Sequence, residues 1–204
     1  AAYLEKAYQQ ASSAEQTAML GELADLHFNA RNYAKAASYY EELKNRGYPH
    51  LDLNMRLAQS YGRSDQFDAA IRIYQALYDD KASAELLYKL AFLYEDKGDY
   101  QRSNKLYRQL LSDFPNNSYD KVAQEKIFWN EYRQEHFGAA LDQIKLLIDA
   151  YPNHPSAAGF PYWLARTYEK AGKKNDAKKI YQRIAGDRSY YGALASLRLT
   201  ASKK

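Results

Sequence analysis

The stretch that decides the fold lies in the middle of the chain, where residues 87–110 are LYKLAFLYEDKGDYQRSNKLYRQL. Apolar side chains stand at positions i, i+3, i+4 and i+7 from Leu87 to Tyr94, which is the spacing of one face of an amphipathic helix. After a Lys-Gly-Asp turn signal, a similar spacing runs from Ser103 to Leu110. The stretch therefore predicts two helices joined by a tight turn.

The pattern of the second helix recurs along the chain. In each copy a small residue is followed four positions later by an aromatic or aliphatic side chain, and Leu or Ile comes three positions after that. The five pairs are Ala36 and Tyr40, Ala70 and Tyr74, Ser103 and Tyr107, Ala140 and Ile144, and Ala177 and Tyr181. Successive small residues are 34, 33, 37 and 37 positions apart. A period of this length is the mark of a solenoid, in which stacked repeats bury a continuous core.

This pattern resembles the tetratricopeptide repeat (TPR), which has a period of about 34 residues and an Ala-x3-aromatic signature in its second helix. The resemblance covers about residues 17–186. It implies an all-α fold, a right-handed superhelix of about five TPR helical hairpins with flanking N- and C-terminal helices. No run of useful length alternates with a period of two, so we expect no sheet.

The repeat spacing predicts one elongated domain with a helix at each end. Residues 1–16 are expected to form an N-terminal helix or partial repeat, and residues 187–204 a C-terminal capping or junction helix. The five hairpins are expected at about residues 17–50, 51–83, 84–118, 119–156 and 157–186. In the fourth hairpin Phe128 stands where the others have Ala, so its first helix is either in register or shifted by one residue to place Trp129 at the helix crossing.

Composition excludes several classes of protein. The 204 residues include no Cys, which rules out a disulfide scaffold, a thiolate metal site and a Cys nucleophile. No stretch approaches the roughly 18–20 apolar residues of a membrane-spanning helix. The chain begins with Ala1 and shows no signal-peptide pattern, so we expect a mature form or an excised piece of a longer protein.

The sequence offers no arrangement of residues for catalysis. None of the four His residues has a metal-ligand partner three or four positions away, and His27 stands in an aromatic packing position of the first hairpin. Nucleophile-elbow, phosphate-loop and zinc-protease motifs are absent. Paired acids such as Asp79 and Asp80 fall at helix ends, where solvated carboxylates are expected rather than the acid of a glycosidase. We therefore predict no enzymatic activity, no cofactor and no metal site in this chain.

The TPR resemblance implies a groove for a protein or peptide partner. In that family the concave side is lined by the first helix of each hairpin, at positions between the packing residues. Carried over by register, these positions are Asp25, Phe28, Asn29, Met55, Gln59, Arg63, Tyr88, Phe92, Glu95, Trp129, Tyr132, Arg133, Tyr162, Arg166 and Glu169. The aromatic ones are candidate anchors, because Tyr and Trp dominate binding hot spots. For Tyr88, Phe92 and Trp129 the alternative is packing against an adjacent helix.

Positive charge gathers at the C-terminal end. Residues 166–204 carry eleven Lys or Arg and three acids, whereas the whole chain has a net charge of only +4. An aromatic residue precedes the small residue by three positions in four hairpins, but the fifth has Lys174 there. A basic end can bind an anionic surface. No recognised nucleic-acid module accompanies it, so nucleic acid is not an expected partner, and a solvated face is the simpler interpretation.

A second resemblance covers about residues 160–199. The order Tyr-Trp-Leu-Ala-Arg from Tyr162, followed later by Tyr-Gly-Ala-Leu-Ala from Tyr191, is similar to the end of the helical superhelix in soluble lytic transglycosylases. In that family a separate lysozyme-like domain follows and cleaves peptidoglycan, and nothing in this chain matches that domain. The resemblance implies a periplasmic or envelope location and glycan strands as a second possible partner. Apart from it, the segment would be an ordinary capping helix.

Two functions follow as expectations. The first is the non-catalytic helical domain that accompanies a peptidoglycan-cleaving lytic transglycosylase in the bacterial cell envelope. The second is a stand-alone TPR scaffold for protein–protein interaction in envelope assembly or polysaccharide secretion. Binding of polyanions through the basic end is a third and weaker hypothesis.

Overall fold

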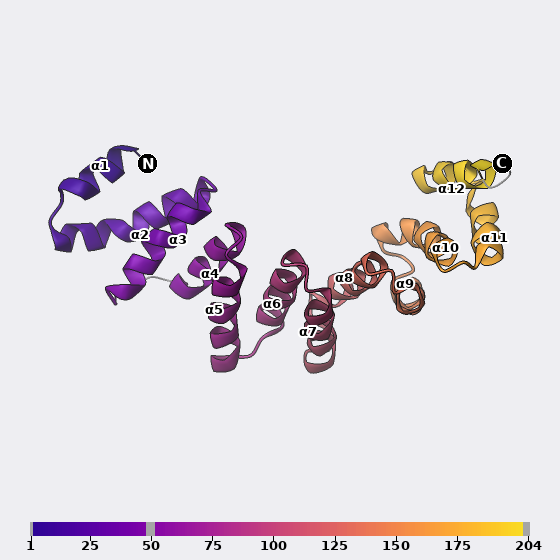
Figure 1. Cartoon of the computed structure of the whole chain (residues 1–204), viewed down its shortest axis with the longest axis horizontal. Helices are drawn as coiled ribbons and strands as arrows, with labels where there is room; N and C mark the ends of the chain where they lie inside the picture. The colour runs from indigo at the N-terminus through magenta and orange to yellow at the C-terminus, as the bar shows by residue number, and fades with distance from the viewer. Residues whose placement is uncertain (1, 48–51, 202–204) are drawn as a thin grey trace. The chain divides into compact units, whose positions relative to one another are not determined.

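The protein is helical throughout the part that the computed structural model describes, which is residues 2–47 and 52–201 (Figure 1). These residues form twelve α-helices and one short 3-10 helix, and no strand. The prediction of an all-α fold is confirmed. The end of the first expected hairpin, at 48–50, and the last residues of the expected C-terminal helix, 202–204, lie outside the described residues.

The helices divide into two compact units, residues 1–98 and 99–204. The boundary falls between the two helices of the third expected hairpin. The grouping of all five hairpins into one domain therefore stays a prediction.

The first unit is a series of helices in which each packs on the next along the chain. The helices are α1 (Ala2–Gln10), α2 (Ser13–Asn29), α3 (Tyr33–Asn45), α4 (Leu53–Arg63), α5 (Phe67–Asp80) and α6 (Ala84–Asp96). Small residues let the backbones approach where helices cross: Ala24 and Ala36 are fully buried and share a core cluster with Tyr40 and Leu57. The N-terminal helix α1 docks on this core through polar contacts, since Glu5 Oε1 lies 2.8 Å from His27 Nε2.

The second unit has the same plan. Its helices are α7 (Tyr100–Asp113), α8 (Asp120–Arg133), α9 (Phe137–Ala150), η1 (Pro155–Gly159), α10 (Phe160–Lys170), α11 (Lys174–Ile184) and α12 (Tyr190–Ala201). Ala177 and Tyr181 of α11 are buried against Ala165 of α10 and Ala195 of α12. The last helix therefore closes the core of the final hairpin.

The turn inside each hairpin has one residue with a positive φ angle. These residues are Arg31, Asp65, Gly98, Glu135 and Gly172, with φ between 61° and 85°. Their spacing of 34, 33, 37 and 37 matches that of the small residues, so each hairpin turns in the same way. Only two of the five are Gly, which favours this backbone conformation; the other three turns have no such signal in the sequence.

The first helix of the fourth hairpin is in register with the others. Phe128 is 2% exposed and lies in one core cluster with Ala140 and Ile144 of α9. Trp129 is only partly buried and packs on the outside of this cluster. The alternative in which Trp129 takes the crossing position is therefore wrong, and Phe128 fills the space that Ala occupies elsewhere.

Candidate partner-binding site

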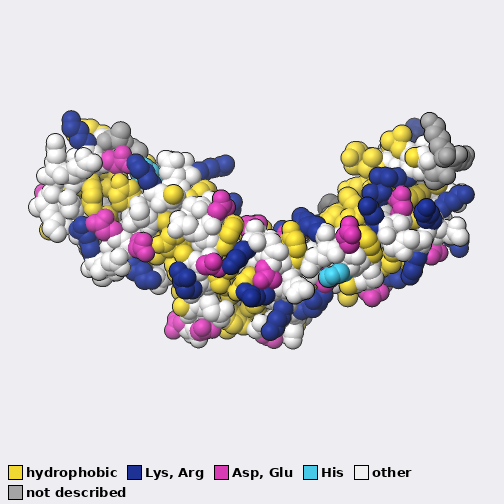
Figure 2. Space-filling model, viewed as in Figure 1, with side chains coloured by type: hydrophobic (Ala, Val, Ile, Leu, Met, Phe, Trp, Pro, Cys, Tyr) yellow, Lys and Arg dark blue, Asp and Glu magenta, His cyan; other side chains and the backbone are white. Residues whose placement is uncertain are grey.

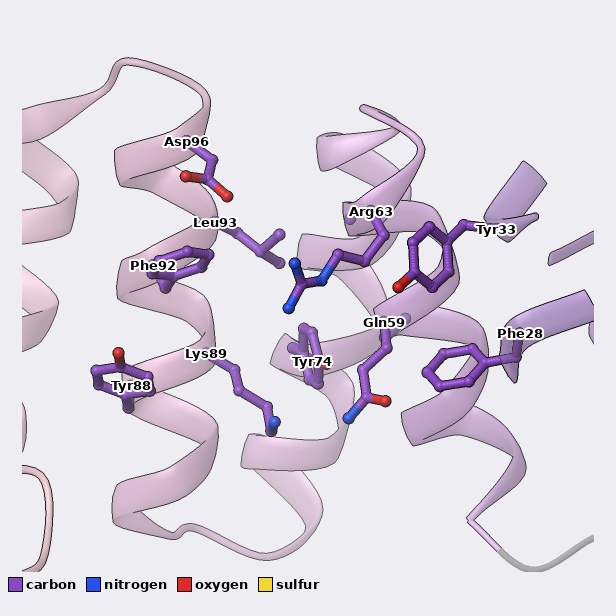
Figure 3. Close-up of a pocket in the computed structure, with 12 residues that line it drawn as sticks. Phe28, Tyr33, Gln59, Arg63, Tyr74, Tyr88, Lys89, Phe92, Leu93 and Asp96 are labelled. Carbon is purple, nitrogen blue, oxygen red and sulfur yellow. The ribbon is translucent and has the colours of Figure 1, made fainter. Parts of the chain in front are cut away.

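A pocket of about 450 Å³ opens in the first unit (Figure 3). Side chains of five consecutive helices, α2 to α6, line it. The lining residues are Phe28, Tyr33, Ala58, Gln59, Gly62, Arg63, Tyr74, Tyr88, Lys89, Phe92, Leu93 and Asp96. Figure 3 shows Gln59 and Arg63 of α4 and Lys89 of α6 reaching into the space between their two helices. The volume falls in the range typical of ligand pockets.

Leu93 of α6 packs against Gly62 of α4, and both residues line the pocket. Gly62 of α4 has no side chain, and a Cβ atom there would lie 2.7 Å from Leu93 Cδ2. On α6, Tyr88 and Phe92 are one helical turn apart, so their rings stand on one face with centroids 6.3 Å apart. The helical repeat of α6 thus presents a double aromatic surface to the pocket.

The walls are aromatic, and the polar groups are mostly cationic or neutral. Arg56 lies 4.8 Å above the ring of Phe28, in cation–π geometry. Lys89 Nζ is 3.3 Å from Glu85 Oε1, an ion pair within α6. Burial, followed by the negative charge of Glu85, raises the pKa of Tyr74 above its ordinary value, so this phenol stays neutral. Such a pocket is suited to binding an amphipathic group.

Five of the nine residues predicted from the first three hairpins meet in this pocket: Phe28, Gln59, Arg63, Tyr88 and Phe92. The other four lie elsewhere. Asp25 accepts a hydrogen bond from the hydroxyl of Tyr40, Glu95 is 7% exposed, Asn29 is exposed and Met55 is half-buried.

The sequence prediction missed four polar or aromatic residues of the pocket: Tyr33, Tyr74, Lys89 and Asp96. Tyr33 and Tyr74 recur at fixed positions of the repeat, so their periodicity concealed that they also line the pocket. Lys89 and Asp96 lie on α6 between predicted groove positions. Their side-chain directions depend on how α4 and α6 pack, which one helix pattern does not specify.

In the second unit the predicted aromatic residues Trp129 and Tyr132 pack on Trp163. The ring centroids of Trp129 and Trp163 are 4.6 Å apart, and those of Tyr132 and Trp163 are 6.0 Å apart. These contacts join α8 to α10. Trp129 also borders a smaller pocket of about 200 Å³ next to Phe160. For Trp129 the packing alternative therefore holds, although part of its surface stays accessible.

The remaining predicted residues have different surroundings. Tyr162 is only 5% exposed and contacts Tyr181 and Tyr191, so its assignment to an accessible groove is corrected to core packing. Arg133 is exposed, with its guanidinium carbon 6.0 Å from the ring centre of Tyr100. Arg166 and Glu169 form an ion pair of 2.8 Å beside a pocket at the C-terminal end.

Metal-binding clusters and membrane spans are both absent from residues 2–47 and 52–201. Within these ranges no group of three or more His, Asp or Glu side chains is placed to hold a metal ion. No helix in the same ranges combines the length and the apolar character needed to cross a membrane.

Comparison with known proteins identifies the class of fold. Residues 85–117 and 162–187 match the model of the tetratricopeptide repeat family. No significant match exists among curated protein sequences.

Solved structures of TPR-type proteins share the architecture. The TPR-like repeats of a putative kinesin light chain from Podosopora anserina align with a TM-score of 0.61 at 16% identity, covering 85% of this chain and 98% of that one. MamA from AMB-1 aligns with a TM-score of 0.60 at 18% identity, covering 89% and 98%. The C-terminal part of a TPR repeat-containing protein from Cytophaga hutchinsonii gives 0.60 at 17% identity, covering 78% and 60%. The chain thus has a TPR-type helical-repeat fold.

Proposed function

We propose that this chain is a TPR-type scaffold that binds a segment of a partner protein in the pocket between α2, α4 and α6. One observation carries the proposal: side chains from the first helices of three successive hairpins converge on a single pocket. Packing within a single hairpin does not require side chains from three hairpins to line one pocket.

The chemistry of the pocket supports a peptide as the ligand. Phe28, Tyr88 and Phe92 provide aromatic area for an apolar side chain, and such residues supply much of the energy at interfaces. Gln59 and Arg63 provide donors that suit the carbonyl groups of a peptide backbone. No catalytic role is needed for this function.

Selection of peptides on the purified protein tests the proposal. A displayed random-peptide library is enriched on the wild-type chain, and the selected peptides are measured by fluorescence anisotropy. We expect Phe92→Ala to weaken binding about tenfold or more, because truncating a residue that acts as a hot spot costs about 2 kcal/mol or more. Library peptides that bind wild type and Phe92→Ala equally well would contradict the assigned site.

A matched control separates recognition from stability. Tyr78→Ala removes an aromatic side chain of α5 that is not among those lining the pocket. Both variants are checked by circular dichroism and by their melting temperatures. Equal losses of binding in both variants would indicate general loosening of the unit and would count against the pocket.

We also propose that the chain acts in the bacterial cell envelope, in the periplasm, as the helical domain that accompanies a peptidoglycan-cleaving lytic transglycosylase. The support is the resemblance of residues 160–199 to that family. The Tyr-Gly segment at 191–192 lies in α12, which packs on α11. Envelope assembly or polysaccharide secretion, served by a stand-alone scaffold, is the alternative.

Binding to purified peptidoglycan glycan strands distinguishes the two. Retention of the chain on the strands, competed by soluble glycan fragments, is expected for the first role. Failure to bind strands, together with capture of a defined envelope protein through the pocket of the first unit, would favour the stand-alone scaffold.

A further inference from the structure

The C-terminal end of the second unit contains a pocket of a different kind. It has a volume of about 300 Å³ and lies among α10, α11 and α12. Three of its lining side chains are cations: Lys174 and Lys178 of α11 and Arg198 of α12. Figure 2 shows Lys and Arg side chains gathered over the end of the chain that carries these helices.

One acid borders this pocket, and its charge is already compensated. Glu169 Oε2 accepts hydrogen bonds from Arg166 Nη1 at 2.8 Å and from the hydroxyl of Tyr181 at 2.9 Å. Arg198 Nη1 is 3.9 Å from the other carboxylate oxygen, at the limit of an ion pair. Lys174 and Lys178 pair with no acid among the residues that the structure describes. The pocket therefore keeps a surplus of positive charge.

Lys174 stands at a position of the repeat where the other four hairpins have an aromatic residue. The corresponding residue of the first hairpin, Tyr33, is an aromatic that lines the pocket of the first unit. The second, third and fourth hairpins also have aromatic residues there, whereas the fifth has an ammonium group in place of the aromatic ring. The same place in the fold is thereby changed from apolar to cationic.

We infer that this pocket binds an acidic segment of a partner protein, with carboxylate side chains placed between Lys174, Lys178 and Arg198. The inference deepens the proposed function, since both pockets take protein segments, but it rests on different residues. Tyr181 and Leu199 add an apolar wall, which suits a carboxylate next to an apolar side chain. A polynucleotide needs instead an extended run of cations along its phosphates, whereas three cations line this pocket, Lys174, Lys178 and Arg198.

The test measures binding of a short fluorescein-labelled peptide rich in Asp, Glu and Leu by anisotropy at low and at physiological salt. The Lys174→Gln, Lys178→Gln double variant is expected to bind about tenfold more weakly, as two exposed charge pairs are lost. The same peptide with Asn and Gln in place of the acids should not bind. An absence of acidic-peptide binding to the wild-type chain would overturn the inference.

A control of equal charge tests whether the pocket matters. Lys179→Gln with Arg183→Gln removes two positive charges from α11 at exposed positions that do not border the pocket. Because all four side chains are exposed, neither double variant should alter the circular dichroism spectrum. We expect the control to change affinity less than about twofold. Equal losses in the two double variants would show unspecific attraction and would contradict a defined site.

Two further measurements distinguish this pocket from a nucleic-acid site and from the pocket of the first unit. A single-stranded oligodeoxythymidine that binds more tightly than the peptide, with the same dependence on Lys174 and Lys178, would replace the inference with a nucleic-acid site. The Phe92→Ala variant should keep full affinity for the acidic peptide. If it does, the two pockets are independent, and failure of the library selection on the first pocket would not count against acidic-peptide binding at the second. If Phe92→Ala loses affinity for the acidic peptide, the two sites are not independent and the inference fails.

Discussion

At the scale of single residues, Phe128 shows how one side chain adapts a repeat. The other four hairpins have a fully buried Ala at this position, namely Ala24, Ala58, Ala91 and Ala165. In the fourth hairpin the benzyl group of Phe128 packs in one core cluster with Ala140 of α9 and Phe160 of α10. The core of this hairpin therefore depends on a larger residue.

Truncating Phe128 should be costly. We expect Phe128→Ala to lower the free energy of unfolding by about 3–5 kcal/mol, since the removed ring leaves a cavity in a packed core. Trp129→Ala should cost clearly less, because Trp129 is only partly buried. Urea denaturation followed by circular dichroism measures both. A larger loss for Trp129→Ala would place the tryptophan at the helix crossing after all.

At the scale of helices, the packing of α12 depends on the absence of a side chain. Gly192 lies in the first turn of α12, and a Cβ atom there would be 2.2 Å from the backbone oxygen of Asp187 and 2.9 Å from that of Ile184. Both are backbone atoms, so they cannot move aside as the end of a side chain can. The helix itself would have to shift.

We expect Gly192→Ala to loosen α12 at a cost of about 1–3 kcal/mol. Faster hydrogen exchange over Tyr190–Ala201 is the corresponding measurement. Gly138→Ala in α9 is the control, because a Cβ atom there meets nothing within 4 Å. Replacing Gly by Ala in a helix typically raises the free energy of unfolding by about 1 kcal/mol. Equal effects of the two substitutions would contradict the close approach.

Polar contacts also join neighbouring helices, and Glu131 of α8 is their centre in the second unit. Its carboxylate accepts hydrogen bonds from Asn104 at 2.9 Å and Arg108 at 2.8 Å, both on α7, and lies 3.1 Å from His136 Nδ1. Burial raises the pKa of Glu131, but the hydrogen bonds from Arg108 and His136 outweigh it and lower this pKa below 4.5.

This lowered pKa predicts a dependence of stability on pH. Because the folded pKa lies below the unfolded one, the contribution of Glu131 is complete above about pH 4.5 and is lost as the pH falls through the folded pKa. Glu131→Gln should cost about 1–3 kcal/mol near neutral pH and progressively less in acid. Urea titrations of both proteins at a series of pH values measure this. A constant difference between them would show that ionisation of Glu131 does not matter.

At the scale of the whole molecule, the chain consists of two units with separate internal packing. Repeat proteins draw their stability from each repeat and its neighbours, so a cut between well-packed groups is tolerated better than one within them. We expect residues 99–204 alone to be helical and to unfold cooperatively in urea. A fragment that begins at Gln66, which separates α4 from α5, should expose apolar surface and aggregate. An unfolded 99–204 fragment would contradict the independence of the second unit.

Much of the fold could be predicted from the sequence, since it depends on contacts near in the chain. The repeat places a tyrosine four positions after the small residue in four hairpins, namely Tyr40, Tyr74, Tyr107 and Tyr181, and all four side chains are buried. Residues three and four positions apart lie on the same face of a helix, so the face that packs in each hairpin can be predicted from the spacing of residues in the sequence.

The candidate sites depended on tertiary structure. Five predicted residues converge on one pocket, yet Tyr162 at a related position is buried in the core. Tyr33, which was not among the predicted groove residues, lines the pocket of the first unit, and the cationic pocket lined by Lys174 needs α12 to close it. The sequence by itself determined the helical repeat, because this follows from local periodicity, whereas the register of the first helix of the fourth hairpin was decided by the burial of Phe128. Only the tertiary structure decided which side chains remain accessible, because that depends on how closely each helix packs against its neighbours.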